Sequence, residues 1–284
     1  MTHPPSTDNA LAWCRERLLV PGHPLTLTLP YAEPSLRDAL LALHGLIGEI
    51  AAVPESVSDA GVARRKLGWW QAALTERQPH PAIQAWLACD GPERLTTADF
   101  EPLIEAVAVE IEPPRFERHQ QLIEHAERVA GAAARLEACL IDAGDAGTAT
   151  LIELAGAAYR VRMVRDLVLD ARRGRWAVPL DLQAEYQLTR SEVVAGEYPR
   201  RLDALVRHLV GDALITLNRD LASLEPFWAW RQRHLVLRLK LDALLAGRIL
   251  RRPLRVTTER IGSGGPVAAF ALWRLARRMQ RRVR

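Results

Sequence analysis

Apolar residues recur about every three to four positions along most of this 284-residue chain, the spacing of one buried helix face. Strand-like alternation is confined to Leu25-Thr26-Leu27-Thr28-Leu29. The pattern therefore predicts an all-α fold. A first helix is expected from the N-cap Asp8 to the break at Pro21-Gly22-His23-Pro24. Further helices are predicted over residues 35–52, 58–76, 81–89, 97–111, 115–143, 148–173, 198–224, 226–251 and 266–282.

Short turns rich in glycine and proline separate these helices, and none is long enough to be a domain linker. Hydrophobic residues make up 49% of the chain, so a large core can form. We therefore expect one helical bundle spanning residues 1–284. The turn at Gly262-Ser263-Gly264-Gly265 has two interpretations, a phosphate-binding helix start or a hinge. The other turns are expected at Pro54, Pro79 with Pro81, Gly91-Pro92, Pro113-Pro114, Gly144 to Gly147 and Gly174.

The positive charge is concentrated at the end of the chain. Removing the six arginines of the last eleven residues changes the formal net charge from +4 to −2. This distribution argues against a nucleic-acid partner and for a local anionic partner at the C-terminus. Three cysteines without a CxxC pair predict neither a disulfide framework nor a cysteine-based zinc site. We expect a cytoplasmic protein without a membrane span or signal peptide.

The C-terminal segment 266–284 combines apolar residues with those arginines. Its composition is typical of an amphipathic helix that lies on an anionic membrane surface, which would place the protein on the inner face of the membrane. The alternative is that the apolar face packs on the bundle and the arginines solvate its end. Both interpretations stay open. The arginines are Arg274, Arg277, Arg278, Arg281, Arg282 and Arg284.

Asp166 and Asp170 lie four residues apart, so both carboxylates are expected on one face of a helix that ends near Gly174. Such carboxylates can hold Mg²⁺ and leave its other positions to water and substrate phosphates, which arginines bind in bidentate fashion. The ordinary alternative is a solvated helix end with ion pairs between neighbours. The candidate metal ligands are therefore Asp166 and Asp170, and the candidate phosphate-binding residues, for a diphosphate if the resemblance described next holds, are Arg165, Arg172, Arg173 and Arg175.

The stretch from Arg165 to Pro179, RDLVLDARRGRWAVP, resembles the second aspartate-rich motif of the squalene/phytoene synthase family, RDxxEDxxxGRxYLP. The stretch from His125 to Gly131 is similar to the family's YAxxTAG sequence. The resemblance implies an isoprenoid-synthase-type helical bundle around a central cavity. It also implies Mg²⁺ ions that bind prenyl diphosphates, and a carbocation that forms when diphosphate leaves.

The first aspartate-rich motif of that family, DDxxD, aligns with Gly48-Glu49-Ile50-Ala51-Ala52, where only Glu49 could bind a metal. In the second motif Leu169 replaces an acidic residue, and Tyr159 and Arg162 stand where the family has Gln and Asn. Ionising an allylic diphosphate requires compensation of the charge that develops on the leaving group. These departures predict that full synthase activity is lost.

The stretch from Glu49 to Ser58, EIAAVPESVS, resembles ELAxVxDSVS in the family branch that contains a mitochondrial complex I assembly factor. This resemblance implies a binding or assembly protein with an isoprenoid-like ligand, or with a protein partner such as a respiratory complex. The alternative is a Mg²⁺-dependent prenyltransferase that condenses two farnesyl or geranylgeranyl diphosphates head to head.

Four further residues are candidates for lining the cavity: His44, Trp69, Trp70 and Tyr159. Trp69 and Trp70 could face an isoprenoid chain or a cation, although adjacent tryptophans on a helix are more often core residues. The eight histidines show neither an HExxH motif nor i,i+4 spacing, so no metal role is assigned to them.

Overall fold

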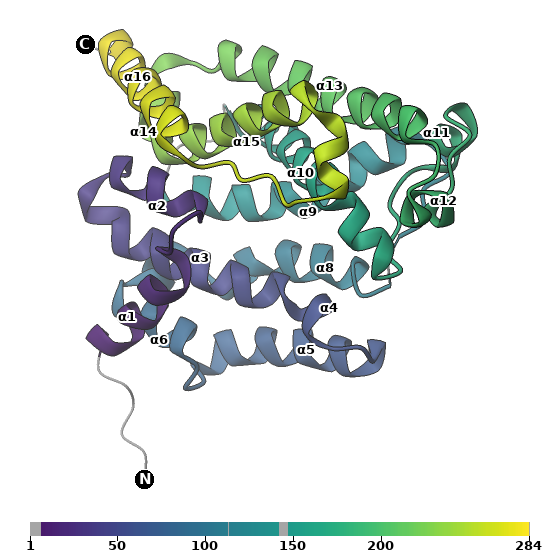
Figure 1. Cartoon of the computed structure of the whole chain (residues 1–284). Coiled ribbons are helices and arrows are strands. Elements are labelled where there is room, and N and C mark those ends of the chain that lie inside the picture. The colour runs from purple at the N-terminus through teal and green to yellow at the C-terminus, as the bar shows by residue number, and fades with distance from the viewer. Residues whose placement is uncertain (1–6, 113, 142–146, 284) are drawn as a thin grey trace.

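The computed structural model describes residues 7–112, 114–141 and 147–283 (Figure 1). Pro113, Gly144 and Arg284, and the side chain of Asp8, lie outside what is described. The first half comprises α1 (Thr7–Leu18), α2 (Pro24–Thr28), η1 (Leu29–Tyr31), η2 (Pro34–Leu36), α3 (Arg37–Ala51), α4 (Val53–Ser56), α5 (Ala60–Glu76), α6 (Pro81–Ala88), α7 (Gly91–Arg94), η3 (Thr97–Phe100), α8 (Glu101–Val109) and α9 (His119–Leu140). The second half comprises α10 (Thr148–Arg172), α11 (Leu180–Glu185), α12 (Arg190–Ala195), α13 (Pro199–Ser223), α14 (Pro226–Arg231), α15 (Arg233–Arg251), η5 (Pro253–Thr257) and α16 (Pro266–Val283).

The described elements are all helical, so the predicted all-α fold is confirmed. Figure 1 shows α1, α3, α5 and α6 in one layer and α13 to α16 in another, with α9 and α10 between them. Each layer has its own hydrophobic core. Helix α9 serves both cores, because Leu122 and Ala134 face one while Leu136 and Leu140 face the other. The central helices therefore hold the two halves together.

Helices α9 and α10 approach each other closely at Gly156. A methyl group at this position would lie 2.7 Å from Cγ of Glu127 and 3.0 Å from its backbone nitrogen. Only a residue without a side chain fits this distance. The close approach places the buried face of α10 directly against α9.

Three local expectations differ from the structure. Residues 24–28 form a helix where alternation suggested a strand, because Pro24 opens the first turn and Nδ1 of His23 accepts a hydrogen bond from the Leu25 amide (3.3 Å). The helix predicted over 226–251 is interrupted at Gln232, which separates α14 from α15. Residues 174–198, expected as a connection, contain the short helices α11 and α12.

The apolar face of α16 packs on the bundle through Ala268, Leu272, Ala276 and Met279. On another face of the same helix, Val267, Phe270 and Trp273 remain exposed. Within the described residues, no helix combines the length and hydropathy that a membrane crossing requires.

Candidate functional site

A pocket of about 260 Å³ lies beside the C-terminal half of α10. It combines acidic, basic and apolar side chains from α4, α9 and α10, from Glu110, Pro114 and Phe116 between α8 and α9, and from the segment that follows α10. The sequence motif around Asp166 therefore faces a cavity rather than open solvent. The lining residues are Glu55, Glu110, Pro114, Phe116, Leu122, His125, Tyr159, Arg162, Met163, Arg165, Asp166, Leu167, Asp170, Arg175, Trp176 and Ala177.

The end of α10 shapes this pocket. Gly174 adopts a left-handed conformation with φ of 86°, which suits a residue without a Cβ atom. The amides of Arg173 and Arg175 both donate to the carbonyl oxygen of Asp170, at 3.0 and 2.9 Å. The chain therefore turns back at Gly174, and Arg175 joins Asp166 and Asp170 in the pocket lining.

Asp166 is held by two guanidinium groups. Nε of Arg165 donates to Oδ1 at 3.0 Å, and Arg260 donates from Nε to Oδ1 at 2.9 Å and from Nη2 to Oδ2 at 3.2 Å. Burial raises the pKa of this carboxyl, but the hydrogen bonds and charges of the two arginines outweigh burial and lower the pKa. The negative charge of Asp166 is already compensated within the protein.

Asp170 differs from Asp166 in its surroundings. Among the described residues, its carboxylate has no hydrogen-bond or ion-pair partner. Burial raises its pKa, the charge of Arg175 lowers it, and the charges of Asp166 and Glu55 raise it, so that the pKa is raised overall. Arg175 forms an ion pair with Oε1 of Glu55 at 3.0 Å. The carboxylate of Asp170 is thus available to bind a ligand in the pocket.

A second polar group, formed by Glu110, His125 and Tyr159, also lines the pocket. Glu110 Oε1 lies 2.6 Å from Nε2 of His125 and accepts a hydrogen bond of 2.9 Å from the Tyr159 hydroxyl. Burial and the neighbouring Glu110 raise the pKa of Tyr159, so this hydroxyl stays protonated and donates. Tyr159, a cavity-lining candidate from the sequence, lines this pocket. Glu110 was not singled out, since its only signal is its position at the end of a predicted helix.

The four candidate arginines separate into two groups. Arg165 and Arg175 line the pocket, whereas Arg172 and Arg173 are exposed and do not belong to its lining. A further arginine, Arg162, lines the pocket and forms an ion pair of 2.6 Å with the buried Asp242 of α15. Three guanidinium groups therefore border the cavity.

Three other candidates lie outside this pocket lining. Glu49 forms an ion pair of 3.0 Å with Arg17 and lies 3.9 Å from His80. Trp70 is buried, and its ring packs edge-on against His80 at a centroid distance of 4.7 Å. Trp69 packs against Trp70 at 5.0 Å and is 42% exposed. Trp70 is therefore a core residue, whereas Trp69 lies exposed beside it.

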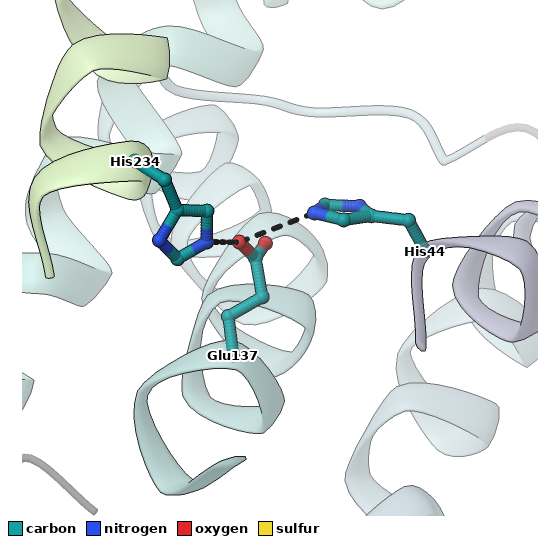
Figure 2. Close-up of side chains that lie close together, drawn as sticks. All are labelled: His44, Glu137 and His234. Atoms are coloured by element: carbon teal, nitrogen blue, oxygen red, sulfur yellow. Dashed lines mark hydrogen bonds and ion pairs between the residues drawn. The ribbon is translucent and has the colours of Figure 1, made fainter. Parts of the chain in front are cut away.

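His44 belongs to a separate buried cluster with Glu137 and His234 (Figure 2). Figure 2 shows the two imidazole rings reaching the carboxylate from opposite sides. Nε2 of His44 lies 3.3 Å from Glu137 Oε2, and Nε2 of His234 lies 3.1 Å from the same atom. Arg238 pairs with Oε1 and lies 2.9 Å from Nε2 of His44. The cluster joins α3, α9 and α15 between the two cores.

The charges around this cluster determine whether it can bind a metal ion. Burial raises the pKa of Glu137, but Arg238 and the two histidines outweigh burial and lower it far below its usual range. Burial lowers the pKa of His234. Two imidazoles and a carboxylate are a suitable ligand set for a divalent metal. However, Arg238 already neutralises the carboxylate, so a metal would have to displace a guanidinium from a buried site.

The pocket beside α10 does not fit a cluster of several Mg²⁺ ions either. Such a cluster needs free carboxylate oxygens on both sides of a diphosphate. Asp166 is bound by two arginines, Glu55 by Arg175 and Glu110 by His125 and Tyr159. Of the carboxylates in the lining, Asp170 alone is ready to act as an oxygen ligand.

Comparison with known proteins relates this geometry to one family. The family model for squalene/phytoene synthase matches residues 21–260. A phytoene synthase of Thermus thermophilus is 28% identical over 169 residues, which cover 58% of this chain and 54% of that protein. The matched region thus spans about half the length of this relative.

Solved structures share the fold at low sequence identity. A squalene synthase, HpnC from Alicyclobacillus acidocaldarius, has a TM-score of 0.71 at 15% identity, with 87% of this chain and 95% of that chain covered. A dehydrosqualene synthase solved with a ligand has a TM-score of 0.72 at 13% identity, with 98% and 97% covered. YisP from Bacillus subtilis has a TM-score of 0.67 at 14% identity, with 94% and 95% covered. At such identities the likeness establishes the fold alone.

Proposed function

This chain belongs to the squalene/phytoene synthase family, and from that premise we propose that it binds one prenyl diphosphate or isoprenoid-like ligand without condensing two. The observation that carries this proposal is the clamping of Asp166 between Arg165 and Arg260. A carboxylate whose charge is already compensated by two guanidinium groups is a poor ligand for a metal ion.

The chemistry of ionisation supports this proposal. Loss of diphosphate from an allylic carbon places negative charge on the leaving group, and metal ions with arginines are the usual means of stabilising it. In this chain residues 48–52 supply one acidic group, Glu49, which is paired with Arg17. Carboxylates on only one side of a bound diphosphate give a cluster of several metal ions too few protein oxygen ligands.

The size and lining of the pocket favour a single ligand. Its volume of about 260 Å³ is below the ~300–1,000 Å³ of pockets that enclose a drug-sized ligand. Arg165 and Arg175 line the pocket and would bind the diphosphate, while Phe116, Leu122 and Trp176 offer apolar surface for the first part of a prenyl chain. Two prenyl chains side by side need more space than this.

A protein that binds a ligand without converting it must have another function, and we propose that this function is the assembly of a protein complex. The EIAAVPESVS segment, which resembles the branch with a complex I assembly factor, includes Glu55, the ion-pair partner of Arg175 at the pocket. Deletion of the gene is expected to reduce NADH-linked respiration. Normal NADH-linked respiration in the deletion strain would overturn the assembly role. Peripheral contact of α16 with a membrane belongs to the same proposal.

A binding experiment tests the ligand directly. Titration calorimetry with a farnesyl thiodiphosphate analogue, which resists ionisation, is expected to show saturable binding of one ligand per chain. Absence of binding with or without Mg²⁺ would overturn the proposed ligand. One observation favours the alternative, a Mg²⁺-dependent head-to-head prenyltransferase: within the described part of the chain, the carboxylate of Asp170 has no partner. Binding of two analogues per chain only in the presence of Mg²⁺ would support that alternative.

A further inference from the structure

A second cavity lies between α16 and the helices beneath it, away from the Asp166 pocket. It has a volume of about 440 Å³ and runs along α13, α14, α15 and α16. Four basic residues line it, Lys240 from α15 and Arg274, Arg278 and Arg282 from α16. No aspartate or glutamate is among its lining residues. We refer to this cavity as the basic groove.

Helical spacing explains the arrangement of the arginines. Arg274, Arg278 and Arg282 are four residues apart, so they form one row along α16. Lys240 approaches from the opposite wall. Among the described residues, Lys240, Arg278 and Arg282 form no ion pair or side-chain hydrogen bond. Cations gathered without a carboxylate repel one another, and an anion in the groove would relieve that repulsion.

The other walls of the groove are apolar. They include Leu221, Leu224, Val236, Leu275 and Met279. A ligand that satisfies both kinds of wall is amphiphilic, with an anionic head and a hydrocarbon part. Nucleic acid would use the cations but would leave these apolar walls without a partner.

An exposed apolar face of α16 adjoins the basic groove. Val267, Phe270 and Trp273 are 76%, 57% and 49% exposed, and the last two rings stack at a centroid distance of 5.7 Å. The guanidinium of Arg274, which lines the groove, lies 5.9 Å from the Phe270 ring centroid. Exposed aromatic side chains interleaved with arginines are typical of helices at a membrane interface. Figure 1 shows α16 at the periphery of the bundle, where a flat surface can reach it.

We propose that the basic groove binds the phosphate head group of an anionic phospholipid at a membrane surface, while Val267, Phe270 and Trp273 enter the interface. Arg278 and Arg282 hold the phosphate oxygens from one wall, and Lys240 holds them from the other. The acyl chain follows the apolar walls toward the bilayer. This site extends the proposed membrane contact of α16 and is independent of any ligand in the Asp166 pocket.

Flotation of the full chain with vesicles tests the proposal. One set of vesicles contains phosphatidylcholine alone, and the other contains equal parts of phosphatidylcholine and phosphatidylglycerol. The test pair is R278Q with R282Q, which line the groove. The matched control pair is R277Q with R281Q, which has the same spacing and the same charge change but lies outside the lining. Circular dichroism and the melting temperature of each variant verify the fold.

The wild-type chain is expected to float with the anionic vesicles and not with the neutral ones. The groove pair is expected to weaken binding at least about tenfold more than the control pair, since it removes two charge-assisted contacts to the phosphate. Equal losses in both pairs would overturn the site, because they would show diffuse attraction. Absence of vesicle binding, or displacement of the vesicles by duplex DNA, would also overturn it. K240Q changes the opposite wall of the groove and is expected to weaken binding to the anionic vesicles. It therefore provides a separate test if the R278Q/R282Q variant does not fold.

Discussion

Arg260 binds Asp166 through two parallel hydrogen bonds, with Nε at 2.9 Å from Oδ1 and Nη2 at 3.2 Å from Oδ2. The two residues are 94 positions apart in sequence. Arg260 follows η5 and reaches back to α10, so the segment after η5 closes over one side of the aspartate motif. The carboxylate of Asp166 is therefore already paired with arginines of the protein before any ligand binds.

The first prediction concerns the pH dependence of this pair. The pKa of Asp166 is lowered in the folded protein, so its stabilisation is present above the pKa of the unfolded chain and is lost as pH falls through the folded pKa. R260Q is expected to reduce the free energy of unfolding by about 0.5–1 kcal/mol near neutral pH, because Arg260 is largely exposed. Urea unfolding should show that this difference shrinks in acid. A difference that is constant with pH would contradict the assignment.

The second prediction separates the arginines that follow Asp170. R175Q is expected to weaken binding of the farnesyl thiodiphosphate analogue about tenfold to a hundredfold, the usual effect of losing a charged hydrogen bond. R172Q removes the same charge from an exposed residue outside the pocket lining and should change affinity less than about twofold. Calorimetry on both variants checks this. Equal effects would mean that the pocket acts through its overall charge.

The motif around Asp166 illustrates what local sequence can predict. Its i,i+4 spacing, the arginines beyond it and Gly174 specify a helix end that carries carboxylates and cations on one face. In the structure Asp166, Asp170, Arg165, Arg175 and Tyr159 line one pocket. Which charge pairs with which was not predictable, because Glu55 and Arg260 are separated from the motif by long stretches of chain. Tertiary packing decides those pairs.

The third prediction concerns the buried cluster of Glu137, His44, His234 and Arg238. E137Q leaves the guanidinium of Arg238 without its buried counter-charge and is expected to cost about 3–5 kcal/mol of unfolding free energy. E33Q removes the exposed partner of Arg233 and should cost less than about 1 kcal/mol. Urea unfolding of both variants provides the comparison. Similar reductions of the unfolding free energy in E137Q and E33Q would show that the buried ion pair of Glu137 contributes no more to stability than an exposed one.

The fourth prediction tests the close approach of α9 and α10. G156A places a methyl group 2.7 Å from Glu127 and 3.0 Å from its backbone, so the helices must separate, at a cost of about 1–3 kcal/mol. G68A on the exposed face of α5 meets no atom within 4 Å and is expected to stabilise the fold by about 0.5–1 kcal/mol through helix propensity. Thermal unfolding should therefore shift in opposite directions. Stabilisation by G156A would refute the packing described for α9 and α10.

Two features of the site show where sequence patterns stop being informative. Glu110 resembles any acidic residue at a helix end, and its role emerges only because α9 and α10 bring His125 and Tyr159 to it. His44 was singled out as a cavity residue, but its contacts are to Glu137 and Arg238, which lie on helices that sequence spacing cannot relate. In both cases the partner is set by helix packing, whereas each helix itself follows from its apolar spacing.

We propose that this pocket, whose lining carboxylates apart from that of Asp170 are already paired within the protein, binds an allylic diphosphate without ionising it. The most direct measurement is release of inorganic diphosphate from farnesyl diphosphate by the purified chain in the presence of Mg²⁺. We expect no release above the protein-free control. Steady turnover at the rate of an ordinary enzyme, about 1 s⁻¹ or more, would contradict the claim.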